Sequence, residues 1–174
     1  MSDTSPFNPN SIYEVKTAIK NNIEYIISTW KQRILLNRQQ LEQSEENFQL
    51  YKYVYSRSSE ILPSTKSIRA NHMNLIHNAS LNYKELYVWM GLQNDFDDMC
   101  LNNINNDGTF LTCIFQYVSS LFNRDENSWY QDLILGNMIV KVLDSKLTGH
   151  QLKSWTEYKE KEKHEWSLGG YDFL

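Results

Sequence analysis

The chain has 174 residues, a length that fits one domain with a substantial buried core. Hydrophobic residues make up 41% of it and charged residues 22%, which excludes a wholly disordered or fibrous protein. The net charge of -4 argues against a nucleic-acid-binding protein, because such domains are usually basic. Cys100 and Cys113 are too few for a disulfide framework and favour a reducing compartment.

The residue pattern predicts an all-α protein without a secretory signal or a membrane span. The N-terminal residues lack a basic stretch followed by an apolar run, and no window of about 18 apolar residues occurs. Prolines are confined to Pro6, Pro9 and Pro63, so the strongest helix breaker is absent from residues 64–174. No internal repeat, heptad run or alternating stretch stands out, and most of the six glycines are expected between helices.

Apolar residues at helical spacing predict where the helices lie, and Ser11 with Glu14 fits a capping box at the first of them. In chain order we expect a helix over residues 11–41, a short helix or packed segment within 42–55, a flexible loop around 56–66, a helix over 67–90, a short helix or turn over 91–99, a polar loop over 101–108, a helix over 109–122, a turn over 123–128, and helices over 129–147 and 151–163.

The predicted helix over residues 129–147 is apolar on almost all sides, which is typical of a helix buried among others. We therefore expect a globular all-α bundle of about seven or eight helices around this central buried hydrophobic helix. Residues 1–10 are expected to be disordered, and residues 11–174 are expected to form a single helical domain.

The sequence lacks the residue patterns of a catalytic or metal-binding site. His72 and His77 are five residues apart, so they do not share a helical face, and no metal-ligand spacing occurs. The acidic residues Asp95, Asp97 and Asp98 lack the spacing of a calcium loop. We expect no metal, no cofactor and no enzymatic activity. The aromatic content of 13% favours binding to a partner protein, although most of these side chains should belong to the core.

Residues 114–143 resemble the first homology segment of the Bcl-2 family of cell-death regulators. In that segment a helix ends in Leu-Phe, a basic residue and Asp follow, and a Trp opens a buried helix. The matching residues here are Leu121, Phe122, Arg124, Asp125 and Trp129. The turn has one extra residue, and Gln131 stands where the family has an Arg.

Two further stretches resemble the other homology segments of this family, in the family's order. The third segment is matched by Ile76, Ala79, Ser80 and Tyr83, with Leu81 in place of the usual Asp. The second segment is matched near the C-terminus by Trp166, Gly169, Gly170, Tyr171, Asp172 and Phe173.

The resemblance implies a hydrophobic surface groove that binds an amphipathic Bcl-2-homology-3 helix of a pro-apoptotic protein. The groove residues that it implies are Tyr83, Tyr87, Tyr117, Val118, Leu121, Trp129, Gln131 and Ile134. In the family the Arg of the first segment pairs with an Asp of the partner. Gln131 is uncharged, so we expect a weaker dependence on that Asp.

The resemblance further implies a regulator of programmed cell death, and a pro-survival role is favoured over a pore-forming one. We expect a cytoplasmic protein whose full-length form is attached to the mitochondrial outer membrane or another intracellular membrane. The attachment would use a C-terminal anchor that this chain lacks. The alternative interpretation is a non-enzymatic helical scaffold or subunit of a larger assembly, in which the aromatic residues serve an oligomeric interface.

Overall fold

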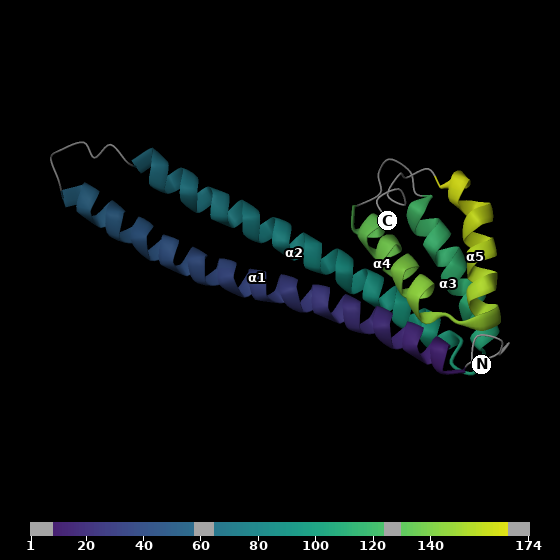
Figure 1. The fold of residues 1–174 in the computed structure, drawn as a ribbon. Helices are drawn as coiled ribbons and strands as arrows, with labels where there is room; N and C mark the ends of the chain where they lie inside the picture. The colour runs from purple at the N-terminus through teal and green to yellow at the C-terminus, as the bar shows by residue number, and fades with distance from the viewer. Residues whose placement is uncertain (1–8, 58–64, 124–129, 167–174) are drawn as a thin grey trace. The chain divides into compact units, whose positions relative to one another are not determined.

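The structure is a computed structural model, and it describes residues 9–57, 65–123 and 130–166. This part of the chain is all-helical, as predicted, and contains no strand (Figure 1). Its helices are α1 (Pro9–Arg57), α2 (Thr65–Asn102), α3 (Asp107–Phe122), α4 (Tyr130–Lys146), α5 (Gly149–Glu162) and the short 3-10 helix η2 (Lys163–Glu165). The first eight residues lie outside the described residues. Of the expected loop around 56–66, residues 58–64 also lie outside them, whereas residues 56–57 belong to α1 and residues 65–66 to α2.

Five α-helices and one 3-10 helix occur in the described residues, instead of the seven or eight expected. Both long helices continue where the sequence predicts an interruption: α1 runs through residues 42–55, and α2 runs through Gly91. A β-carbon added at Gly91 would meet nothing within 4 Å, so neither packing nor backbone geometry requires a helix end there. No proline lies inside either helix to stop it.

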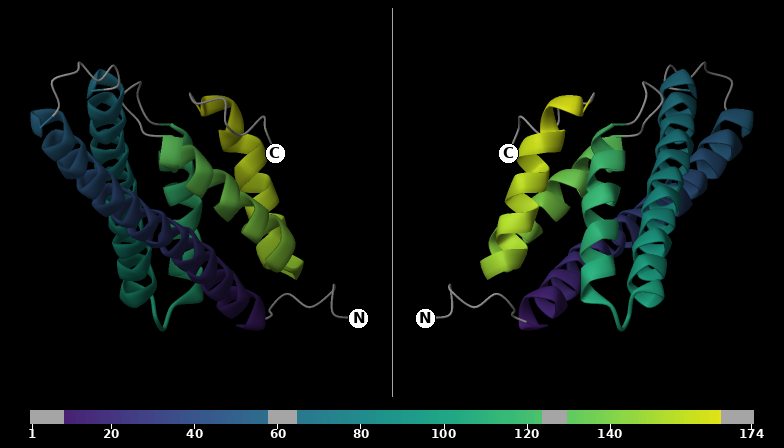
Figure 2. Two further views of the ribbon diagram at one scale, coloured as in Figure 1. Left: turned by 90° about the vertical axis from the view of Figure 1, so that its left-hand side faces the viewer. Right: turned by 90° about the vertical axis from the view of Figure 1, so that its right-hand side faces the viewer.

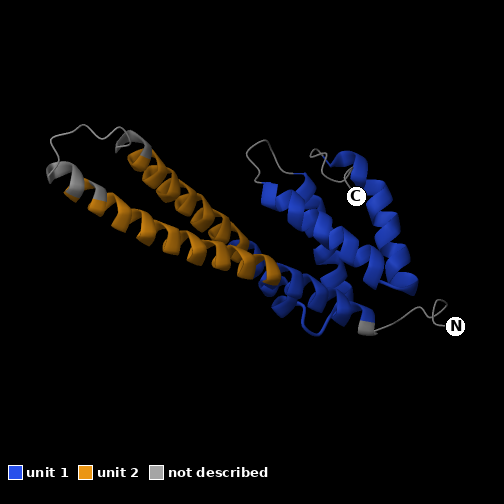
Figure 3. Ribbon diagram, turned by 60° about the vertical axis from the view of Figure 1, so that its left-hand side comes forward, with its two compact units in different colours: residues 1–24, 91–174 blue, residues 25–90 orange. Residues whose placement is uncertain are grey.

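The chain divides into two compact units (Figure 3). Unit 1 consists of Met1–Glu24 and Gly91–Leu174, and unit 2 consists of Tyr25–Met90. α1 and α2 each contribute residues to both units. The single domain expected over residues 11–174 stays a prediction.

In unit 1, α3 packs along α4, and α5 packs against both of them (Figure 2). The apolar side chains of these helices and of the first turns of α1 are buried at helical spacing, as their periodicity predicts. Buried members include Ile12, Val15, Ile19, Phe110, Ile114, Val118, Leu121, Leu135, Ile139, Leu143 and Trp155.

The start of α1 differs from the predicted capping box. The helix begins at Pro9, so Ser11 lies inside it, and the buried Ser11 hydroxyl donates to Oε1 of Gln151 at 2.6 Å. Proline is well suited to the first turn because it has no N–H to leave unsatisfied. A side-chain cap is instead present at α3, where Oδ1 of Asn106 accepts from the amide of Thr109 at 3.0 Å.

α4 corresponds to the helix that the sequence predicts to be central, and most of its sides are buried. Its covered residues include apolar ones such as Leu135, Ile139 and Leu143, and also the polar Gln131 and Asp132. One edge remains exposed, formed by Tyr130, Ile134, Lys141 and Ser145. The helix is therefore a principal part of the core of unit 1 with one solvent-facing edge.

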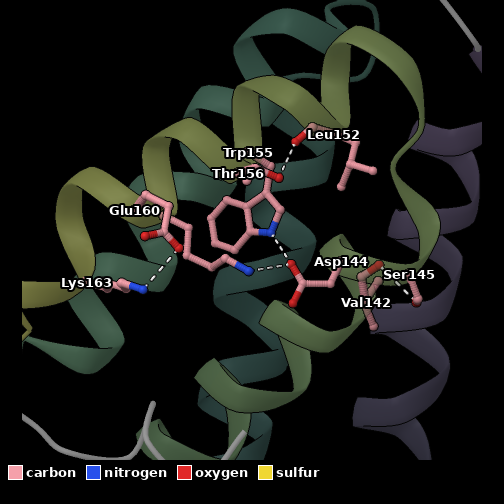
Figure 4. Close-up of polar contacts among 9 residues, drawn as sticks. Val142, Asp144, Ser145, Leu152, Trp155, Thr156, Glu160 and Lys163 are labelled. Carbon is pink, nitrogen blue, oxygen red and sulfur yellow. Dashed lines mark hydrogen bonds and ion pairs between the residues drawn. The ribbon is translucent and has the colours of Figure 1, made fainter. Parts of the chain in front are cut away.

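Polar contacts join α5 to the end of α4 (Figure 4). Oδ1 of Asp144 accepts from the indole N–H of Trp155 at 2.7 Å and from the ammonium group of Lys159 at 2.9 Å. Gly149 begins α5 with a φ of 55°, a left-handed conformation that glycine adopts without strain. The two hydrogen bonds of Asp144 link the end of α4 to α5 and hold the buried Trp155 ring in place.

Candidate functional site

Unit 2 is a hairpin in which residues 25–57 of α1 lie antiparallel to residues 65–90 of α2 (Figures 1 and 3). Each helix presents a stripe of buried or half-buried residues whose spacing alternates between three and four. On α1 these residues are Ile27, Trp30, Ile34, Asn37, Leu41, Ser44 and Phe48. On α2 they are Ile68, His72, Leu75, Ala79, Asn82, Leu86 and Trp89. Spacing that alternates between three and four is typical of the seam of a coiled coil.

Contacts around His72 fix the register of the seam. The Ser44 hydroxyl lies 2.9 Å from Nδ1 of His72, and a carboxylate oxygen of Glu45 lies 3.1 Å from Nε2. The imidazole also stacks on Phe48, with ring centroids 5.8 Å apart and planes 1° from parallel. Because the helices are antiparallel, this register places Leu41 at the level of Leu75.

The heptad pattern escaped the sequence analysis, which predicted no such run. Four seam positions carry polar residues, namely Asn37, Ser44, His72 and Asn82. They interrupt the apolar repeat that usually reveals a coiled coil. Polar residues in a seam cost stability but specify register, and the Ser44–His72 contact is an example of such pairing.

A second stripe on α2 is exposed, and we call it the α2 stripe. It lies one residue beyond each seam position from His72 to Trp89, which turns it by about 100° from the seam. Its members are Met73, Ile76, Ser80, Tyr83, Tyr87 and Met90. The five large side chains among them are exposed by 57%, 44%, 50%, 81% and 44% in that order. Exposed aromatic and methionine side chains on a single face are typical of a protein-binding surface.

The two ends of this surface differ in charge. A hollow of about 440 Å³ adjoins Ile76, and its other lining residues are Leu41, Glu42, Glu45, Glu46 and His72. Farther along the hairpin, Arg38 donates from Nη2 to the Tyr83 hydroxyl at 3.3 Å. That hydrogen bond raises the pKa of the Arg38 guanidinium, and the carboxylate of Glu42 contributes to the same shift.

A second hollow of about 740 Å³ in the hairpin is uncharged. Its lining residues are Gln40, Gln43, Ser44, Asn47, Ile68, Asn71 and Leu75. Of these two hollows, only the one beside Ile76 is lined by carboxylates.

Two of the predicted groove residues, Tyr83 and Tyr87, lie together on the α2 stripe in unit 2. Tyr117, Val118, Leu121, Gln131 and Ile134 belong to α3 and α4 of unit 1, and Trp129 lies outside the described residues. The predicted groove residues that the structure describes are thus divided between the two units.

The unit 1 members of the predicted set differ in exposure. Ile134 is 43% exposed and Tyr117 is half-buried. Val118 and Leu121 have no exposed surface, because the apolar face of α3 packs into the core of unit 1. As the structure places them, these two side chains belong to the core of unit 1.

Gln131, which stands where the family's Arg would be, is 2% exposed. Its Oε1 atom has no hydrogen-bond partner in the part of the chain that the structure describes. A buried acceptor without a partner costs about 1–3 kcal/mol, so the position is unfavourable even for an uncharged amide.

The groove residues predicted from the sequence do not include Met73, Ile76 and Met90. The glutamates beside Ile76 were also missed. The sequence contains a signal for these surface residues, because α2 carries apolar residues in two adjacent stripes at heptad spacing. A helix in a two-helix hairpin can bury only one of them against its neighbour.

No known protein family matches the chain, and neither the curated proteins nor the solved structures include a significant match. None of the described helices is both long and apolar enough to cross a membrane. Within the same residues, no group of three or more His, Cys, Asp or Glu side chains is arranged to hold a metal ion.

Proposed function

We propose that this chain is a non-enzymatic protein that binds an amphipathic α-helix of a partner protein along the α2 stripe. The supporting observation is the exposure of large apolar side chains at heptad spacing on one face of the hairpin. A partner helix with apolar residues at i, i+3 or i+4, and i+7 would match this spacing and complete a three-helix arrangement.

The resemblance to the Bcl-2 family specifies the proposal further. The chain would regulate programmed cell death, in a pro-survival role, by holding Bcl-2-homology-3 helices of pro-apoptotic proteins. A Bcl-2-like arrangement of helices, and action in the cytoplasm and at the mitochondrial outer membrane or another intracellular membrane, belong to the same proposal. Three residues that carry the resemblance in the third segment, Ile76, Ser80 and Tyr83, are members of the α2 stripe.

A fixed subunit of a larger assembly is the second candidate, because a permanent interface would also need exposed apolar side chains. Titration with a panel of fluorescent Bcl-2-homology-3 peptides separates the two functions. A regulator binds some of these peptides, whereas a structural subunit binds none.

The binding surface is tested by substitution of Tyr87, the most exposed member of the α2 stripe. We expect Tyr87→Ala to weaken peptide binding by about tenfold or more, as loss of a buried aromatic anchor usually does. Tyr25→Ala is the matched control, because Tyr25 is 74% exposed on α1 of the same unit and lies outside the stripe. Equal effects of both substitutions would exclude the α2 stripe as the binding surface.

The pro-survival role has its own test in liposomes. A pro-survival protein should prevent the release of contents that an activated pore-forming relative causes. Release caused by this chain alone, after activation by a peptide, would identify it as pore-forming.

A further inference from the structure

Acidic and basic side chains lie at different positions along the surface beside the α2 stripe. Glu42, Glu45 and Glu46 line the hollow at Ile76 together with the imidazole of His72, and no Lys or Arg of the described residues lines it. All three glutamates are exposed, so they are accessible to an arriving side chain. The Glu45–His72 contact leaves Glu42 and Glu46 available at the rim.

Basic side chains lie near Tyr83. Arg38 is hydrogen-bonded to the Tyr83 hydroxyl, and the exposed Lys84 follows Tyr83 in the sequence. A guanidinium has five N–H donors, so the bond to Tyr83 leaves Arg38 able to bind a carboxylate. On α1, Arg38 is four residues from Glu42 and eight from Glu46, which corresponds to about 6 and 12 Å along the helix.

We propose that the occupant of the α2 stripe is a partner helix of matching polarity, with basic side chains over the hollow at Glu42 and Glu46 and acidic side chains one to two turns away at Arg38 and Lys84. The inference rests on the proposed function and specifies the chemistry of the partner. Apolar contact supplies the affinity, while the charges select the partner and fix its direction and register. A helix with the same apolar residues but without this order of charges would place acidic side chains beside Glu42 and Glu46, basic side chains beside Arg38 and Lys84, or both.

Two synthetic helical peptides of identical composition test the polarity. Both carry the same apolar residues, but one has its basic and acidic flanking residues at opposite ends, and the other alternates them. Since exposed ion pairs contribute about 0.2–1 kcal/mol each, we expect the polarised peptide to bind about fivefold more tightly at low salt. Its advantage should shrink in high salt, because the pairs are exposed.

Variants of the protein test whether the hollow at Ile76 causes the preference for the polarised peptide. Glu42→Gln with Glu46→Gln should abolish the advantage of the polarised peptide and leave the Glu45–His72 contact intact. The control, Gln40→Lys with Asn71→Lys, raises the net charge equally but changes the uncharged hollow. It should leave the advantage unchanged. Circular dichroism verifies that each variant retains its helices.

The outcomes separate the two proposals. If both peptides bind equally well, the polarity is wrong and the helix-binding function stands. If neither peptide binds and the Bcl-2-homology-3 panel also fails, the proposed function itself is wrong. If the protein alone forms dimers in sedimentation velocity that Tyr87→Ala abolishes, a second copy occupies the stripe, which would overturn the proposal of a partner helix.

Discussion

A side chain at position 136 in α4 would press against the ring of Phe122. A β-carbon there would lie 2.9 Å from the ring of Phe122. The ring cannot easily retreat, because it stacks on Trp166 with centroids 4.9 Å apart, and the indole N–H of Trp166 donates to Ser119. Gly136 therefore allows α3 and α4 to approach each other and is no helix end, contrary to the expectation for most glycines.

Gly136→Ala should lower the free energy of unfolding by about 1–3 kcal/mol, the usual cost of overpacking a core. Gly91→Ala is the control, because its β-carbon would meet nothing within 4 Å and alanine favours the helix. Urea titration followed by circular dichroism measures both. A Gly136→Ala protein as stable as the wild type would show that α3 and α4 are not packed this closely.

Burial raises the pKa of the Cys100 thiol, because the charged thiolate is poorly solvated inside unit 1. Since folding favours the protonated form, its contribution to stability is present below the ordinary thiol pKa and is lost as the pH rises through the raised value. The free energy of unfolding should thus fall more steeply above about pH 8.5 in the wild type than in Cys100→Ala. Identical pH profiles would contradict the burial of this thiol.

At the scale of elements, Asp144 couples α4 to α5 through its two hydrogen bonds, to Trp155 and Lys159. Asp144→Ala removes both bonds and should cost about 1–2 kcal/mol, whereas Asp144→Asn keeps an acceptor for the indole and should cost about 0.5 kcal/mol. Thermal unfolding monitored by Trp fluorescence measures the difference. Glu160→Gln, which alters only the exposed ion pair with Lys163, is expected to have almost no effect.

The hairpin shows what a helix pattern can and cannot specify. The spacing of residues such as Ile27, Ile34, Leu75 and Leu86 predicts helices with apolar faces. It does not determine which apolar stripe of α2 faces α1, because two adjacent stripes have suitable spacing. The contact of Ser44 with His72 identifies the buried one.

At the scale of the whole molecule, the two units have different interiors. In unit 2 the buried hydrophobic side chains among the described residues are Ile27, Ile34 and Trp89, whereas unit 1 buries whole faces of its helices. Fewer buried contacts allow easier local opening. We expect amides of residues 25–57 and 65–90 to exchange hydrogen at least about tenfold faster than those of α3 and α4.

Native-state hydrogen exchange with mass spectrometry measures this difference. A bound partner helix should slow exchange in unit 2, since binding stabilises the region that it covers. Uniform protection along the chain would show that the two units open together.

The amino-acid sequence alone determined the all-helical class, the approximate positions of α3, α4 and α5, and the apolar faces of these helices. These features follow from local spacing and from the distribution of helix breakers. Only the tertiary structure decided that Val118 and Leu121 are core residues, that Tyr83 and Tyr87 are exposed, and that Gly136 meets Phe122. The physical reason is that periodicity defines a face of a helix, whereas the neighbour that covers this face comes from a distant part of the chain.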